Sequence, residues 1–333
     1  MTSDASFENV GLAISIVNWR TSEMVGNCLA SMAPEIDKSI HVLVVDNGSE
    51  DGSKEAISDF IRSKGWNWVT LIPLSENRGF AAGNNAAIRC AKANFPNLEG
   101  VMLLNPDTLV MPKAISTMQK FLRSNPDIGI VGGRSEHLDG SPQDCSFKFY
   151  NPISEFCSNF RFGKLNKLLD RYVNNGNIPE EPTEVDWVSG AFMLVRKQVF
   201  DDIGFMDEAF FLYFEETDFT FRARKHGWRC WHIPEARIVH LVGQSSGVTN
   251  KALRHARRPA YWYQSRARYF LLNHGRGYAL FCDALALLGS SLLVLRCLLS
   301  GEISPNPERY LRDLVTLGTI GVLMKSQQPR VIA

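Results

Sequence analysis

The sequence predicts an α/β fold in which helices flank a mainly parallel central sheet, followed by a helical extension at the C-terminal end. Short apolar runs alternate with helix-forming stretches through the first half of the chain, as in consecutive βαβ units. A hydrophobic fraction of 45% in 333 residues is enough for one large core with an appendage. Beyond about residue 250 the alternation stops, and basic, aromatic and apolar stretches follow.

The alternating region predicts its elements in a regular order. Turn-forming Ser, Thr, Asp, Asn or Gly residues precede each helical stretch, and proline suits the first turn of the last helix. The predicted strands lie at residues 12–18, 41–46, 69–73 and 101–104. The predicted helices lie at residues 22–33, 53–64 and 81–93, with a further helix beginning at Pro112.

The regular alternation is lost between residues 140 and 182, where aromatic residues cluster and an Asn/Pro/Glu-rich stretch follows. We expect this part of the chain to be a long excursion that covers or shapes a binding cleft. Regular structure resumes at residues 185–196, and a helix is predicted at residues 216–225.

The extension mixes basic and aromatic residues, a composition suited to a lipid headgroup region. An apolar stretch at 278–299 follows, and Asp283 and Arg296 leave only twelve uncharged residues between them, too few to span a bilayer. We expect a helix that lies on a membrane surface, and a protein-packed or dimerising helix pair is the open alternative. The arginines of this mixture are Arg254, Arg257, Arg258, Arg266 and Arg268.

Bulk composition limits the classes of function. A net charge of +1 gives no global field for nucleic acid, so an anionic ligand must be held by local groups. The seven cysteines are scattered and lack zinc-site spacing, as expected for reduced thiols. The polar, acidic residues 1–9 do not resemble a secretory signal, so we expect a cytoplasmic protein.

Polar residues follow four predicted strands: Asn18, then 46–49, then 77–79, then 105–107. Ligands of open α/β sheets bind beyond the carboxyl ends of the strands, so these segments predict one shared site. Asp107 directly follows a buried strand and is the leading metal ligand, since a hard cation with carboxylate ligands can hold a nucleotide diphosphate. A turn or helix-capping role ahead of Pro112 is the alternative for Asp107.

Five motifs in order resemble family 2 glycosyltransferases, especially their rhamnosyltransferase branch, over roughly residues 11–270. The resemblance implies a Rossmann-like GT-A fold and sugar transfer with inversion. It also implies a catalytic domain at 1–250, with a nucleotide-binding half (11–135) and an acceptor-binding half (136–250), and an extension at 251–333. The motifs are VVDNGS (44–49), ENRGFAAGNN (76–85), LNPD (104–107), WVSGAF (187–192) and FLYFEETD (211–218).

The resemblance implies roles for the residues at these positions. Asp46 would contact the nucleotide base, with the backbone around Asn18 beside it, while Asn77, Gly79 and Asn84 would border the nucleotide and ribose. The segment from Asn105 to Asp107 would bind the metal and diphosphate, although the first position is usually acidic. The full predicted donor-binding set is Asn18, Asp46, Asn47, Ser49, Asn77, Gly79, Asn84, Asn105, Asp107, Trp187 and Gly190.

The acidic run at 215–218 suits inverting transfer, which needs one carboxylate to remove the acceptor hydroxyl proton. By motif position Glu216 is this base, with Glu215 as the fallback. The alternative is that these acids stabilise the start of the following helix, and for Asp218 we expect an i,i+4 pair with Arg222.

Two further predictions concern the metal and the sugar. The resemblance makes His240 the second metal ligand with Asp107, and an imidazole suits Mn²⁺ better than Mg²⁺. Trp187 either borders a sugar or packs in the core, and Gly190 would allow close backbone approach.

Together these features predict transfer of a hexose or deoxyhexose, such as L-rhamnose, from a dTDP- or UDP-sugar. The expected acceptor is a glycan or lipid-linked oligosaccharide of cell-surface polysaccharide, met at the inner face of a membrane, where the C-terminal helices could also form a homodimer. A nucleotide-sugar-binding scaffold without turnover is one alternative. A dinucleotide-dependent oxidoreductase is another, although no GxGxxG follows the first strand.

Overall fold

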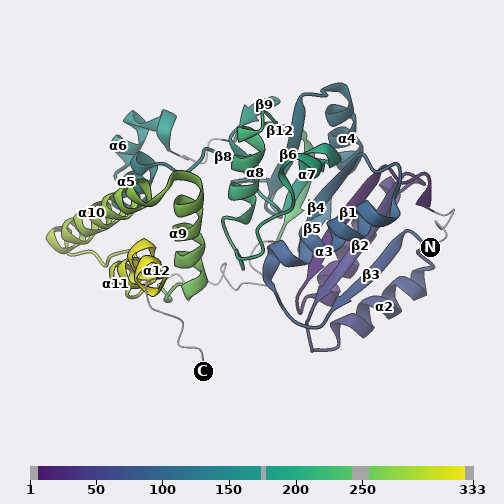
Figure 1. Ribbon diagram of the computed structural model, residues 1–333, viewed down its shortest axis with the longest axis horizontal. Coiled ribbons are helices and arrows are strands. Elements are labelled where there is room, and N and C mark those ends of the chain that lie inside the picture. Colours follow the sequence, from purple (N-terminus) through teal and green to yellow (C-terminus); the bar gives the residue numbers. More distant parts are fainter. Residues whose placement is uncertain (1–6, 174–177, 242–254, 327–333) are drawn as a thin grey trace.

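The computed structural model describes residues 7–173, 178–241 and 255–326 (Figure 1). Its centre is a ten-stranded sheet whose main path runs β3-β2-β1-β4-β11-β6-β12-β5, with β7 beside β6 and β9 beside β12. The first four strands of this path are parallel to one another, as predicted. They are β1 (Leu12–Asn18), β2 (Ile40–Asn47), β3 (Val69–Leu74) and β4 (Gly100–Leu104).

The second half of the sheet is mixed. Strand β11 lies antiparallel between β4 and β6, β12 runs parallel to β6, and the short β5 runs antiparallel to β12. The sequence prediction of a mainly parallel sheet therefore describes the first half only. The strands are β5 (Thr108–Val110), β6 (Ile128–Glu136), β7 (Pro142–Gln143), β9 (Thr183–Val185), β11 (Phe192–Arg196) and β12 (Arg229–His240), and β8 (Ser146–Phe147) pairs with β10 (Trp187–Val188) apart from the sheet.

Helices cover both faces of the sheet. The apolar sides of α1, α2 and α4 join one core cluster, and those of α3, α7 and α8 join the other. Helix α4 begins at Ala114 rather than at Pro112, because Lys113 between them has a left-handed φ of 69° that precludes a helical turn. The helices are α1 (Ser22–Met32), α2 (Ser53–Lys64), α3 (Gly79–Asn94), α4 (Ala114–Ser124), α7 (Lys197–Ile203) and α8 (Glu215–Lys225).

The region predicted as an irregular excursion contains two helices, α5 (Pro152–Phe160) and α6 (Gly163–Leu168). Asn151 and Ser154 form a reciprocal capping box at the start of α5, a local signal that the aromatic clustering obscured. Helix α5 packs closely on α10 (Arg276–Ser300), since a Cβ added at Gly289 would lie 2.5 Å from the carbonyl oxygen of Phe156. The excursion thus joins the C-terminal helices at one end of the molecule (Figure 1).

The C-terminal region consists of α9 (Ala260–His274), α10, α11 (Tyr310–Leu317) and α12 (Thr319–Ser326). Arg266 is 1% exposed and pairs with Glu155 at 2.8 Å and with Asp283. Three described arginines of the basic stretch therefore form ion pairs, and Arg266 is buried inside the protein. Contact of the others with lipid headgroups stays a prediction, and Arg254 lies outside the described residues. Arg257 and Arg268 pair with Asp313 and Asp207.

Candidate active site

The ends of β1 and β2 hold a buried polar network. The parallel register places Asn18 beside Asp46, and the amide of Asn18 donates to Asp46 Oδ1 at 2.8 Å and to Ser49 Oγ at 3.1 Å. Ser49 in turn donates to the same carboxylate oxygen at 2.5 Å. The three residues are at most 4% exposed, so this part of the predicted donor edge is preformed and rigid.

A second network joins β2 to the start of α3. Asn47 donates to Asn77 Oδ1 at 3.0 Å and to the carbonyl oxygen of Gly79 at 3.1 Å. A Cβ at Gly79 would lie 2.1 Å from the carbonyl oxygen of Phe211, so only glycine fits this contact. Asn84 is turned inward: it accepts from Ser15 and donates to the first turn of its own helix.

The predicted metal ligands lie side by side. Asp107 Oδ1 is 3.3 Å from His240 Nε2, and Asn105 Nδ2 is 3.4 Å from the same nitrogen. Pairing of β12 with β5 brings His240 opposite Thr108, which explains how residues far apart in sequence meet. No group of three or more His, Cys, Asp or Glu side chains suited to a metal occurs within the described ranges. An ion held here would have two protein ligands and would depend on its bound substrate for the rest.

The acidic run begins helix α8. Tyr213 and Phe214, immediately before it, both have left-handed φ values, 71° and 70°, which are rare for bulky residues. Glu215 is 2% exposed and Glu216 is half-buried, and the Oε2 atom of each is buried with no hydrogen-bond partner. Burial raises the pKa of Glu216, and burial together with the charge of Glu216 raises the pKa of Glu215 well above its ordinary value.

The turn at 189–191 connects the acidic run to the metal ligands. A Cβ added at Gly190 would lie 3.1 Å from the Phe80 ring and 3.9 Å from Glu216 Oε1, so the backbone approaches this carboxylate closely. The next residue, Ala191, accepts a hydrogen bond from the backbone amide of Asn105 at 3.0 Å. Glu216 and the 105–107 segment therefore both lie next to one short turn.

Trp187 packs in the core rather than facing this turn. Its ring stacks on Phe147 with centroids 4.2 Å apart, its indole nitrogen donates to the carbonyl oxygen of Lys148, and it is 7% exposed. These contacts favour the packing alternative that the sequence left open.

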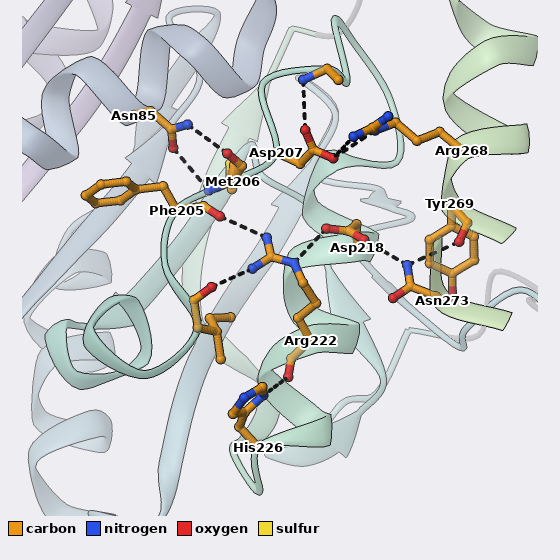
Figure 2. Close-up of polar contacts among 12 residues, drawn as sticks. Asn85, Phe205, Met206, Asp207, Asp218, Arg222, His226, Arg268, Tyr269 and Asn273 are labelled. Atoms are coloured by element: carbon orange, nitrogen blue, oxygen red, sulfur yellow. Dashed lines mark hydrogen bonds and ion pairs between the residues drawn. The ribbon is translucent and has the colours of Figure 1, made fainter. Parts of the chain in front are cut away.

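Two contacts of helix α9 near the acidic run were not predicted from the sequence. Asp218 pairs with Arg222 at 2.8 Å, as predicted, and also accepts a hydrogen bond from Asn273 in α9 (Figure 2). Arg268 of α9 binds Asp207, a pairing that leaves no mark in the sequence because 61 residues separate the two.

Comparisons with known proteins agree with this geometry. Residues 10–265 match the model of a family described as glycosyltransferase like family 2. The chain is 27% identical over 250 residues to the N-acetylglucosaminyl-diphospho-decaprenol L-rhamnosyltransferase of Mycobacterium tuberculosis, covering 71% of this chain and 78% of that one. It is 26% identical over 197 residues to rhamnosyltransferase WbbL of Escherichia coli, covering 57% and 71%.

A solved structure is similar over nearly the whole chain. The mannosyltransferase PcManGT from Pyrobaculum calidifontis, solved with GDP-Man and Mn²⁺, superposes with a TM-score of 0.51 at 15% identity, covering 95% of this chain and 88% of that one. This likeness confirms the predicted GT-A fold and leaves the dinucleotide oxidoreductase without support. Because the family model spans most of the sequence, the chain belongs to glycosyltransferase family 2 and is a glycosyltransferase.

Proposed function

We propose that this enzyme transfers a hexose or deoxyhexose, L-rhamnose in the first instance, from a dTDP- or UDP-sugar to a lipid-linked glycan with inversion. One observation carries the proposal: the Glu216 carboxylate lies beside Gly190, and the next residue, Ala191, accepts from the amide of Asn105 in the segment that ends at Asp107. Inverting transfer needs a base on one side of the anomeric carbon and a held diphosphate on the other. The two relatives support a rhamnosyl donor, and the name of one supports a diphospholipid acceptor.

Asp107 and His240 would hold the divalent cation. Their 3.3 Å separation fits two adjacent ligands of one ion, which at bond lengths of about 2.1 Å in octahedral geometry lie about 3 Å apart. An oxygen and an imidazole ligand together suit Mn²⁺ better than Mg²⁺. When bound, the ion would neutralise charge on the leaving diphosphate.

Glu216 would act as the base, and its surroundings suit that task. A carboxylate whose pKa is raised toward the working pH accepts a proton more readily than an ordinary one, while still ionising in part. Glu215 is the fallback, and burial together with the charge of Glu216 raises its pKa as well. Asp46, with Asn18 and Ser49, would hold the base of the nucleotide.

The acceptor would be met at the cytoplasmic face of a membrane. Helix α10 is long and apolar enough to cross a bilayer by length and composition, but 39% of its most apolar window is buried inside the protein. We place its exposed face on the bilayer surface, beyond a catalytic domain of residues 1–250 whose predicted boundary lies outside the described residues. Its exposed leucines include Leu288, Leu295, Leu298 and Leu299.

The donor is tested by measuring the Tm with a panel of sugar nucleotides, each with and without Mn²⁺, followed by transfer assays with the donors that stabilise. Stabilisation by dTDP-rhamnose that requires the ion and leads to transfer would support the proposal. Stabilisation without transfer to any glycan or lipid-linked acceptor would favour a binding scaffold. Flotation with anionic vesicles tests the location, and a vesicle-independent dimer would instead assign the α10 face to a second copy.

A further inference from the structure

The segment 205–214, here called the strap, runs from α7 to the acidic run and is bonded to α3 on one side. The side chain of Asn85 donates to the carbonyl oxygen of Met206 at 2.8 Å and accepts from its amide at 3.1 Å. The amide of Phe80 donates to the carbonyl oxygen of Phe211 at 2.9 Å. Because α3 borders the donor edge, the strap has a fixed position on the donor side.

Helix α9 bonds the strap and the acidic run on the other side. Arg268 donates twice to Asp207 Oδ2, at 2.7 and 2.5 Å, and Ser265 donates to the carbonyl oxygen of Leu212 at 3.2 Å. Five residues beyond Arg268, Asn273 donates to Asp218 Oδ1 at 2.7 Å (Figure 2). The three contacts span the strap from its beginning to the first turn of α8.

The strap holds a strained backbone between these attachments. The left-handed backbone of Tyr213 and Phe214 is unfavourable for bulky residues and persists only where the surroundings fix it. Rings of α9 supply much of that surrounding: Tyr261 lies 6.2 Å from Tyr213, and Trp262 lies 6.1 Å from Phe214, measured between centroids.

The other carboxylate oxygen of Asp218 is connected to the start of the strap through Arg222. Asp218 Oδ2 accepts from Arg222, whose two remaining nitrogens donate to the carbonyl oxygens of Ile203 and Phe205 at 2.9 Å each. A continuous polar chain therefore runs from Asn273 in α9 through α8 to the start of the strap (Figure 2). Displacing α9 would move both ends of the segment that places Glu216.

We propose that Arg268 and Asn273 are positioning residues for the transfer reaction, and that α9 acts through the strap to hold Glu216 at the 189–191 turn. The inference rests on the proposed role of Glu216 as the base. It makes the first helix of the C-terminal region part of the catalytic apparatus.

The test uses the full chain with Asn273→Ala and Arg268→Gln. We expect kcat to fall about 10–100-fold, the loss typical of a misplaced reacting group, while the KM for the donor stays within twofold. The acidic limb of the kcat profile should move to lower pH, because a loosened strap admits water and weakens the burial that raises the Glu216 pKa. Glu215 and Tyr150 are the titratable groups whose charges couple to Glu216, and neither is changed. Arg268→Lys keeps a positive charge facing Asp207, so it should retain most of the activity that Arg268→Gln loses.

Arg229→Gln is the matched control, because Arg229, like Arg268, forms ion pairs, but its carboxylate partners Asp127 and Glu184 lie outside the strap. Hydrogen exchange at 207–218 gives a readout independent of turnover and should quicken in Asn273→Ala and Arg268→Gln but not in Arg229→Gln. Faster exchange with unchanged kcat and pH profile would overturn the positioning role while leaving the proposed function intact. A uniform loss of Tm and kcat in all variants, with no shift in the pH profile, would also overturn it.

Discussion

The polar network at the ends of β1 and β2, here called the donor edge, and the acidic run at 215–218 differ in how their polar atoms are bonded. At the donor edge the polar side-chain atoms of Asn18, Asp46 and Ser49 bond to one another at 2.5–3.1 Å. In the acidic run, Glu215 and Glu216 each have a buried oxygen with no partner, after two residues of strained backbone. A satisfied network costs little and fixes a binding surface, whereas a partnerless buried carboxylate costs stability and is typical of a reactive group.

Removing the carboxylate of Glu216 should reduce turnover more than any other substitution considered. Glu216→Gln keeps the shape of the acidic run but removes the group that accepts the acceptor proton, so kcat should fall about 10²–10⁴-fold. Donor binding, measured by calorimetry, should be unchanged. Turnover within a few-fold of the wild type would assign the base to Glu215 or another residue, and the partnerless oxygen of Glu216 would then not mark the reactive group.

Removing a proposed ligand of the divalent cation should have the next largest effect on catalysis. Asp107→Ala removes one of two protein ligands, so kcat/KM should fall at least about 10²-fold, since a metal ion contributes several kcal/mol to stabilising the leaving group. Donor affinity in the wild type should fall to the level of the variant when a chelator is added. Equal donor affinity with and without the chelator would reject the metal assignment.

A smaller effect is expected at the donor edge. Asp46→Ala leaves two buried donors, Asn18 Nδ2 and Ser49 Oγ, without their shared acceptor, at about 1–3 kcal/mol each. The donor KM should rise about 10–100-fold while the pH profile of kcat keeps its shape. Asp37→Ala, which removes an exposed turn aspartate bonded to Ser39, is the control and should change neither quantity.

The smallest effect concerns the pH dependence of stability. The raised pKa of Glu215 means that the folded state keeps a proton which the unfolded chain releases, so the free energy of unfolding falls as pH rises above about 4.5. Glu215→Gln removes this loss, and its Tm should exceed that of the wild type by a few degrees at pH 8 and by less at pH 5. A constant difference between the two pH values would show that Glu215 is ionised throughout.

The donor half was predictable because its signals are local. Strand β1 and helix α2 have the predicted bounds, and the polar residues at the ends of β1 and β2 meet because parallel strands end at one edge. The pair of Asp107 and His240 needed the family resemblance, since the strand pairing that joins them spans more than a hundred residues.

The remainder could not be predicted because it depends on contacts between distant segments. Nothing local distinguishes Arg266, a buried ion-pair partner, from Arg229, an exposed one. The sequence left open whether Trp187 borders a sugar or packs in the core, because only the folded chain places Phe147 against its ring. Helix α5 was missed because aromatic residues that face α10 resemble an irregular cleft-lining segment until α10 is placed beside them.

The buried ion pairs of Arg266 limit how far the protein can be truncated from its C-terminal end. The family match ends at residue 265, one position before it, while its carboxylate partners come from α5 and α10. Asp283 also accepts from the amide of Thr319 in α12 at 3.0 Å. A fragment trimmed to the recognised family region would remove the cation that pairs with Glu155 and would uncover the apolar face of α5 that meets α10. Such a fragment should aggregate on expression, so the practical minimum for this enzyme extends well past its family boundary.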